Sequence, residues 1–252
     1  FMTGYAMSVY AIAASLIGRT SETFASWVGV TTPLIATVLY TFSASYFKTS
    51  KYGIGWSWAS ALTFAIAFGQ ALTLFNIPAQ YIALAWVGLA AVYMAVERLL
   101  SLIPEAGTGK IERYWFEKFH WPLITGVLIL STLGLNFSLA DTFAAFAGTQ
   151  LADYLPPILA QLLLVILAIS SARLYQQRWP LFIEPFLAFL PVTLFFIGYG
   201  EKIFQQSLST PQFALVWTGL GAIHLLAAVF IDRAKVRYAH GLYFGAYALL
   251  TW

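Results

Sequence analysis

The sequence contains no cysteine, and charged residues make up only 9% of its 252 residues. The absence of cysteine excludes disulfides, thiolate metal sites and cysteine nucleophiles. Ordinary globular proteins carry about 25% charged residues, because a soluble fold needs polar side chains on its surface. With 60% hydrophobic residues and a mean hydropathy of +0.78, this chain is expected to have lipid as its solvent. The net charge of +3 is too small to indicate a nucleic-acid partner.

Nine apolar stretches, bounded by charges, proline or glycine, are candidates for membrane spans. A bilayer core of about 30 Å needs about 20 apolar residues in a helix, and the first and last stretches are short. The sequence therefore predicts an all-α polytopic membrane protein with about nine transmembrane helices, at residues 1–18, 24–47, 53–75, 79–103, 119–139, 155–175, 179–199, 212–231 and 238–252. Because the chain begins with Phe and ends inside an apolar run, we expect it to be a fragment of a longer protein.

Lysine and arginine are distributed unequally between the two sides of this arrangement. Of the 13 basic residues, only Arg19 and Lys202 follow odd-numbered spans, and the other eleven follow even-numbered ones. Short loops rich in Lys and Arg stay on the cytoplasmic side of a membrane. We therefore expect the even-numbered loops to be cytoplasmic, with the protein integral to a bacterial inner membrane.

Two stretches of the chain have a second copy. Residues 83–92 align without gaps with residues 214–223, and residues 22–29 align with residues 141–148. Each offset spans four helices, so successive copies enter the membrane from the same side, unlike inverted repeats. We therefore expect parallel four-helix repeats, with a helical hairpin as the alternative elementary unit. The expected units are residues 1–118, with a cytoplasmic interfacial helix within 104–118, residues 119–237, and the start of a further helix at 238–252.

Small residues at i and i+4 let helices approach closely in lipid. Three such pairs predict helix crossings: Ala25 with Gly29, Ala144 with Gly148, and Gly241 with Gly245.

Intramembrane ionisable residues are the usual indication of function in a membrane protein, and two are candidates here. Glu184 lies shortly inside the seventh span beside a proline, and we expect it either to form a proton or cation site or to pair with Arg178 or Arg173. His224 lies near the middle of the eighth span, where an imidazole needs a partner. Its counterpart in the repeat is Tyr93, which favours an interhelical hydrogen bond.

Five further polar residues are candidates for an external site: Gln70, Glu201, Glu22, Asp141 and Asp153. Gln70 and Glu201 occupy matching positions beside glycines, where they line a vestibule or simply meet water. Glu22 and Asp141 occupy matching positions in a pattern typical of a helix start, where the helix dipole favours an acid. At the end of the fourth span, Glu97 and Arg98 are expected to form a structural cap, in which they either snorkel toward the membrane surface or neutralise each other.

Cofactor sites are not indicated. A membrane haem needs facing histidines at suitable depths, and His120 and His240 lie at span ends instead. Every lysine lies outside the predicted spans, in an expected loop, so a buried retinal Schiff base is disfavoured. Residues 107–110 resemble the end of a phosphate-binding loop. The rest of that motif is missing, because Pro104 stands where it needs Gly, Ile111 stands where it needs Ser or Thr, and no strand precedes it. We expect no cofactor and no metal.

Three functions remain open from the sequence. The leading hypothesis is a non-enzymatic scaffold or accessory subunit of a membrane complex, whose partners are the lipid bilayer and other membrane subunits. The alternatives are a transporter or channel with a site between the repeat units, and a membrane enzyme that acts on lipid-linked substrates through its external carboxylates. Because so few charges lie inside the spans, we favour the first.

Overall fold

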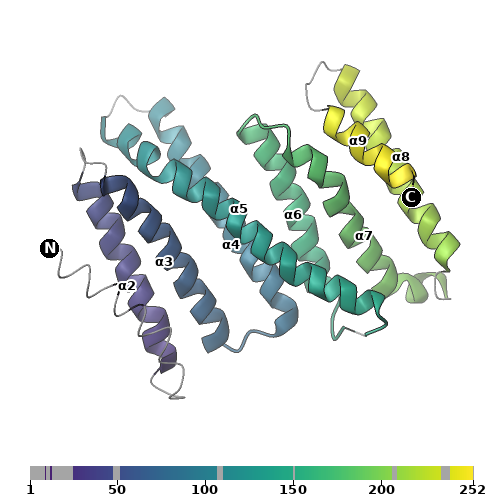
Figure 1. Ribbon diagram of the computed structural model, residues 1–252, viewed down its shortest axis with the longest axis horizontal. Helices are drawn as coiled ribbons and strands as arrows, with labels where there is room; N and C mark the ends of the chain where they lie inside the picture. The colour runs from purple at the N-terminus through teal and green to yellow at the C-terminus, as the bar shows by residue number, and fades with distance from the viewer. Residues whose placement is uncertain are drawn as a thin grey trace. The chain divides into compact units, whose positions relative to one another are not determined.

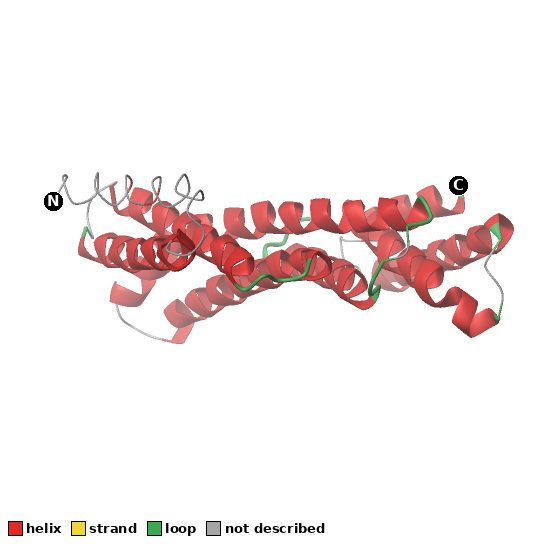
Figure 2. Ribbon diagram, turned by 90° about the horizontal axis from the view of Figure 1, so that it is seen from below, coloured by secondary structure: helices red, strands yellow, loops and turns green. Residues whose placement is uncertain are grey.

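The computed structural model describes residues 9, 12, 25–47, 52–106, 110–149, 151–205, 209–233 and 239–251. In these residues every regular element is an α-helix (Figure 1), and no strand occurs among them (Figure 2). The helices are α2 (Ala25–Tyr46), α3 (Tyr52–Leu74), α4 (Ala79–Ala106), α5 (Lys110–Phe146), α6 (Leu155–Leu174), α7 (Pro180–Phe204), α8 (Thr210–Arg233) and α9 (Ala239–Leu250). Within the described ranges seven of them, α2 to α8, are long and apolar enough to cross a membrane. The chain therefore fits a helical membrane protein, the class that its composition predicted.

The two ends of the chain differ from the seven central spans. The first predicted span, residues 1–18, lies outside the described residues except for Val9 and Ile12. The last, predicted at 238–252, contains α9, which has 12 residues. The described part of this helix extends about 18 Å, which is less than a bilayer core of about 30 Å.

Helix α5 is longer than the sequence predicted. A separate interfacial helix within 104–118 was expected before a span at 119–139, whereas α4 continues to Ala106 and α5 runs for 37 residues from Lys110 to Phe146. The physical reason is that residues 110–121 contain neither Gly nor Pro, so nothing ends the helix where the charged segment meets the span.

A proline inside α5 removes one of its hydrogen bonds, and another helix replaces it. Pro122 has no N–H to donate to the carbonyl oxygen of Lys118, four residues earlier. The hydroxyl of Ser57, on α3, lies 2.6 Å from that oxygen, to which it can donate, and 2.8 Å from the carbonyl oxygen of Ile54 in its own helix. This contact joins α3 and α5 at the point where α5 lacks its own donor.

The chain divides into two compact units. One comprises Phe1–Pro78 and Leu89–Leu130, and the other comprises Ala79–Gly88 and Ser131–Trp252. Helices α4 and α5 therefore contribute residues to both units.

Hydroxyl groups join α2 and α3 in the first unit. Thr37 Oγ1 lies 2.9 Å from Thr63 Oγ1, and Thr41 Oγ1 lies 2.7 Å from Ser60 Oγ. As the residue number rises on α2 it falls on α3, so the two helices are antiparallel. Apolar packing continues the contact, with the ring of Tyr40 stacked on Trp56 at a centroid distance of 5.4 Å.

Close approaches at glycine hold the second unit together. A Cβ at Gly198 on α7 would lie 2.5 Å from the ring of Tyr154, which precedes α6. A Cβ at Gly241 would lie 2.8 Å from the carbonyl oxygen of Leu181, and one at Gly245 would lie 2.1 Å from the ring of Pro185. The predicted crossing at Gly241 and Gly245 is therefore confirmed as a contact of α9 with α7.

The other two predicted crossings have different outcomes. Gly29 lies inside α2 and packs against the side chain of Gln70 on α3. Its sequence counterpart Gly148 lies in the turn after α5 with a φ of +83°, and no atom lies within 4 Å of a Cβ built there. The prediction of a helix crossing at Gly148 is wrong, because a positive φ belongs to a turn and not to a helix.

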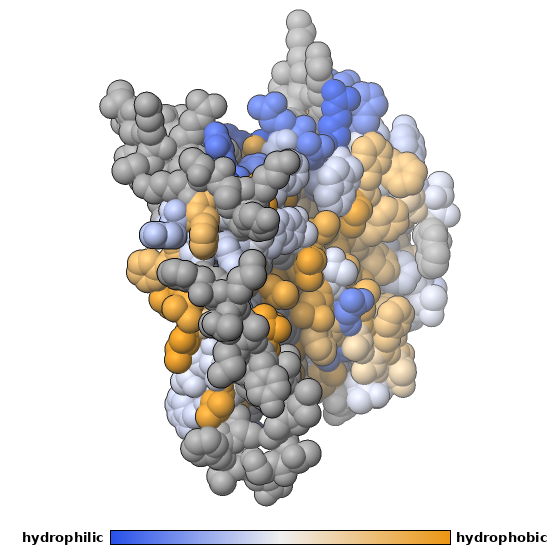
Figure 3. All heavy atoms as spheres, turned by 60° about the vertical axis from the view of Figure 1, so that its left-hand side comes forward, coloured by the Kyte–Doolittle hydropathy of each residue, from blue (hydrophilic) through white to orange (hydrophobic). Residues whose placement is uncertain are grey.

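Many large apolar side chains are exposed on the outside of the helices. Figure 3 shows apolar side chains over much of one face, with hydrophilic ones gathered mostly toward one edge. On α2 the exposed fraction is 69% for Phe42 and 61% for Ile35, and on α8 it is 72% for Leu215. Side chains of this kind are stable outside a protein when the solvent is lipid.

Candidate functional site

Glu184 and His224 form a buried carboxylate–imidazole pair between α7 and α8. Both residues are buried, with 5% and 7% of their surface exposed. His224 Nε2 lies 3.4 Å from Glu184 Oε1 and 3.3 Å from Glu184 Oε2. The expectation that Glu184 pairs with Arg178 or Arg173 is wrong. Both arginines are exposed, and the partner of the carboxylate is the imidazole.

The backbone around this pair also carries polar atoms. His224 Nδ1 lies 2.9 Å from the carbonyl oxygen of Leu220, one turn earlier in α8. On α7, Pro185 cannot donate to the carbonyl oxygen of Leu181, and Gly241 of α9 packs against that carbonyl group. Glu184 Oε2 is buried and has no hydrogen bond of acceptable geometry. The carboxylate therefore lies at a turn of α7 that both α8 and α9 contact.

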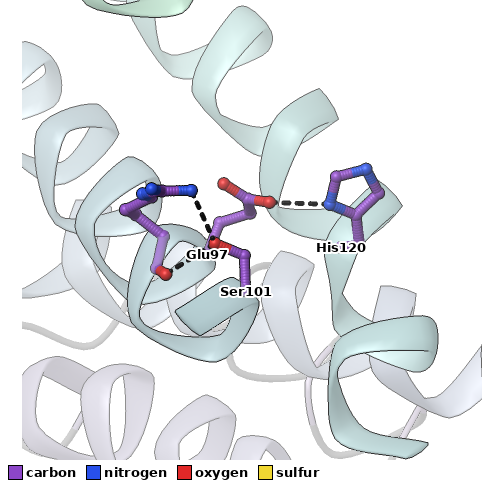
Figure 4. Close-up of polar contacts among 4 residues, drawn as sticks. Glu97, Ser101 and His120 are labelled. Atoms are coloured by element: carbon purple, nitrogen blue, oxygen red, sulfur yellow. Dashed lines mark hydrogen bonds and ion pairs between the residues drawn. The ribbon is translucent and has the colours of Figure 1, made fainter. Parts of the chain in front are cut away.

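A second carboxylate–imidazole pair joins α4 and α5 in the other unit. Glu97 Oε1 lies 2.7 Å from His120 Nδ1 (Figure 4). The side chain of Glu97 is 3% exposed and that of His120 is 26% exposed. Arg98, the expected partner of Glu97, instead donates from Nη1 to Ser101 Oγ at 3.2 Å. That prediction is wrong because neighbours in sequence point to different faces of a helix, whereas antiparallel helices bring Glu97 and His120 together.

The sequence held one signal for this second pair. Glu97 and His120 lie on the two sides of the same connection, and residues at similar distances from a helical turn face each other in an antiparallel hairpin. No comparable signal relates Glu184 to His224, which are 40 residues apart.

A third buried polar group, which the sequence analysis did not single out, joins α5 and α6. Gln161 Nε2 donates to Thr142 Oγ1 at 2.8 Å, and Thr142 Oγ1 donates to the carbonyl oxygen of Ser138 at 2.9 Å. Gln161 Oε1 and Ser138 Oγ are buried and accept no hydrogen bond from the described residues. Uncharged polar residues are common in spans, so their presence in a sequence is a weak signal.

The structure does not bring the predicted external residues together. Glu22 lies outside the described residues. Asp141 lies near the carboxyl end of α5, so the expectation that it starts a helix is wrong. Asp153 precedes α6, where its Oδ1 accepts the backbone N–H of Leu155 at 2.9 Å. No hydrogen bond or ion pair joins Asp141 to Asp153, both of which are described.

Gln70 and Glu201 also have different surroundings. Gln70 is half-buried and packs against Gly29, whereas Glu201 is exposed near the end of α7. Among the described residues, no three His, Asp or Glu side chains lie close enough together to hold a metal ion.

Comparisons of this chain with protein-family models, with curated proteins and with solved structures find no match.

Proposed function

We propose that this chain is a non-enzymatic integral membrane protein that acts as a scaffold or accessory subunit of a membrane complex. One observation carries the proposal: polar side chains inside the spans bind other helices of the same chain. Thr37 binds Thr63, Ser57 binds the Lys118 carbonyl, Gln161 binds Thr142, and Trp217 donates to Thr193. Polar groups used in this way stabilise the association of helices in lipid.

The sequence repeat belongs to this proposal. Helices α4 and α8 begin at Ala79 and Thr210, and this spacing equals the offset of 131 between the two matching stretches. The second match, at an offset of 119, aligns the beginning of α2 with the end of α5 and the turn after it, and gives the repeat less support. Repeated helices would build a long apolar surface from one elementary packing.

Membrane and sidedness are further parts of the proposal. The concentration of Lys and Arg after even-numbered spans supports a bacterial inner membrane with those loops in the cytoplasm.

Purification from the native membrane tests the scaffold function. A photo-crosslinking residue is placed at an exposed lipid-facing position, Leu215 of α8 or Phe42 of α2, and at buried Leu194 as the matched control. We expect a stoichiometric partner to copurify, and to be crosslinked from an exposed position but not from Leu194. A chain that purifies alone in mild detergent and crosslinks only to lipid contradicts the proposal.

A transporter or channel is the second candidate, and one observation favours it. Glu184 and His224 place two ionisable groups inside spans, where each is costly and where such groups mark ion or proton paths. Proton uptake into vesicles that contain the purified protein, followed with a pH-sensitive dye, would test it. Glu184→Gln is the comparison. No observation favours the membrane enzyme, because Asp153 binds the backbone N–H of Leu155 and Asp141 belongs to no acidic cluster among the described residues.

A further inference from the structure

The hydrogen bonds of His224 determine which ring nitrogen carries its proton. A carbonyl oxygen only accepts hydrogen bonds, so the 2.9 Å contact with Leu220 requires a proton on Nδ1. In a neutral imidazole the other nitrogen, Nε2, then has no proton and can only accept. Nε2 is the atom that faces both carboxylate oxygens of Glu184, at 3.4 and 3.3 Å.

Without a further proton, Nε2 of His224 and the carboxylate oxygens of Glu184 would all be hydrogen-bond acceptors with no donor between them. Three lone-pair atoms would face one another inside a membrane span, where no water competes for them. One additional proton removes the conflict, whether it is bound to Nε2 or to the carboxyl group. We propose that Glu184 and His224 form an intramembrane proton-binding site that holds one exchangeable proton between α7 and α8.

Charge balance also favours one proton at this site. With one shared proton the pair is neutral overall; without it a lone carboxylate is buried, and with two protons a lone imidazolium is buried. No other charged group among the described residues lies within ion-pair distance of either side chain. The remaining ionisable groups on α7, α8 and the helices packed on them make no ion pair with Glu184 or His224; they are Tyr199, Glu201, Lys202, Asp232, Arg233, Arg173, His240, Tyr243 and Tyr247.

The contact is long, so it holds the shared proton only weakly. Charge-assisted hydrogen bonds of this type are usually about 2.7–2.9 Å long, whereas the two distances here are 3.4 and 3.3 Å. In addition, Glu184 Oε2 has no other donor that would hold the carboxylate in its ionised form. A weak bond releases its proton more readily than a short, well-aligned one.

The pair between α4 and α5 provides a matched comparison. There the carboxylate of Glu97 faces His120 Nδ1 at 2.7 Å. A neutral imidazole with its proton on Nδ1 satisfies this contact without any additional proton. The two contacts differ because the carbonyl oxygen of Leu220 places the proton of His224 on Nδ1, the nitrogen that does not face the carboxylate.

Nuclear magnetic resonance of the protein in lipid nanodiscs tests the proposal directly. The chain contains three histidines, so ¹⁵N-labelled histidine gives few signals, and the signals of His224 are those lost in His224→Asn. At neutral pH we expect Nδ1 of His224 to be protonated and the pair to hold one further proton, on Nε2 or on ¹³C-labelled Glu184. Raising the pH should remove that proton and change the His224 and Glu184 signals together.

Two variants separate the site from a general effect of pH. In Glu184→Gln the amide N–H₂ can donate to Nε2, so the helices remain packed and one exchangeable proton per chain is lost in a proton-release titration. In Glu97→Gln the His224 signals and the proton of the α7–α8 pair should be unchanged. If Glu184→Gln fails to fold, the coupled titration of the wild-type signals still decides the question.

The proposal is overturned if Nε2 of His224 is bare while Glu184 is ionised at neutral pH. It is also overturned if Nε2 carries the only ring proton, or if the shared proton is not released at any pH at which the chain stays folded. This site does not depend on the scaffold function: a chain without partners can hold the proton, and a subunit with partners can lack it.

Discussion

At the scale of single residues, small hydroxyl groups compensate for backbone hydrogen bonds that proline removes. In lipid an unsatisfied carbonyl oxygen is costly, because no water is available to bind it. Ser57 donates to the Lys118 carbonyl oxygen, which Pro122 leaves without its usual helical donor. A serine on one helix therefore makes a proline on another tolerable.

A double-mutant cycle tests this relation. We expect Ser57→Ala to lower the free energy of unfolding by about 1–2 kcal/mol, since it removes a buried hydrogen bond. In a Pro122→Ala background the loss should fall to half or less, because residue 122 then donates to Lys118 itself. Unfolding in mixed detergent micelles measures both values.

Ser45→Ala is the matched control for this cycle. Ser45 Oγ bonds only within α2, to the carbonyl oxygen of Phe42, so its removal should have little effect. Equal losses for Ser57→Ala in both backgrounds would show that Pro122 and Ser57 are not coupled.

At the scale of the helices, α7 is the element on which the second unit is assembled. His224 of α8 contacts it at Glu184, and α9 contacts it at Leu181 and Pro185. The ring of Pro185 projects from α7 toward α9. A neighbouring helix can pack closely against such a ring where it carries glycine, which has no side chain. The glycines of α9 satisfy this requirement.

Substitution of these glycines should therefore separate α9 from α7. In Gly245→Ala the new Cβ would lie 2.1 Å from the Pro185 ring, so we expect a loss of stability of about 1–3 kcal/mol. Gly219→Ala on α8 is the control, because nothing lies within 4 Å of its Cβ position. Thermal unfolding in detergent measures both variants, and similar melting temperatures for them would count against the α7–α9 contact.

At the scale of the whole molecule, we expect the distribution of charge to set the orientation. The few basic residues are concentrated after the predicted even-numbered spans, and positive charge resists transfer across a membrane.

Reporter fusions test the orientation. A fusion after Lys110, between α4 and the apolar part of α5, should report a cytoplasmic location, and one after Asn76, between α3 and α4, an external one. An alkaline phosphatase and a fluorescent reporter at each site give opposite signals and control for expression. An external Lys110 would contradict the predicted orientation.

The candidate sites show how far the sequence could lead. It indicated Glu184 and His224 separately, because each is an ionisable residue inside an apolar stretch, but the only partners that it offered for Glu184 were nearby arginines. It assigned Glu97 to Arg98, next to it in sequence, whereas the partner is His120 on another helix. In each case nearness in sequence was a poor guide, because α-helices turn adjacent side chains to different faces.

The sequence by itself determined the solvent, the secondary structure and most of the helix positions, since these follow from the length and composition of local apolar stretches. Only the tertiary structure decided which polar side chains meet, because partners on different helices depend on how those helices rotate and cross. It also decided that the imidazole of His224 faces Glu184 through Nε2, while that of His120 faces Glu97 through Nδ1. A difference between two nitrogens of one ring is invisible in a sequence, and the proposed proton of the α7–α8 pair depends on it together with the Leu220 contact.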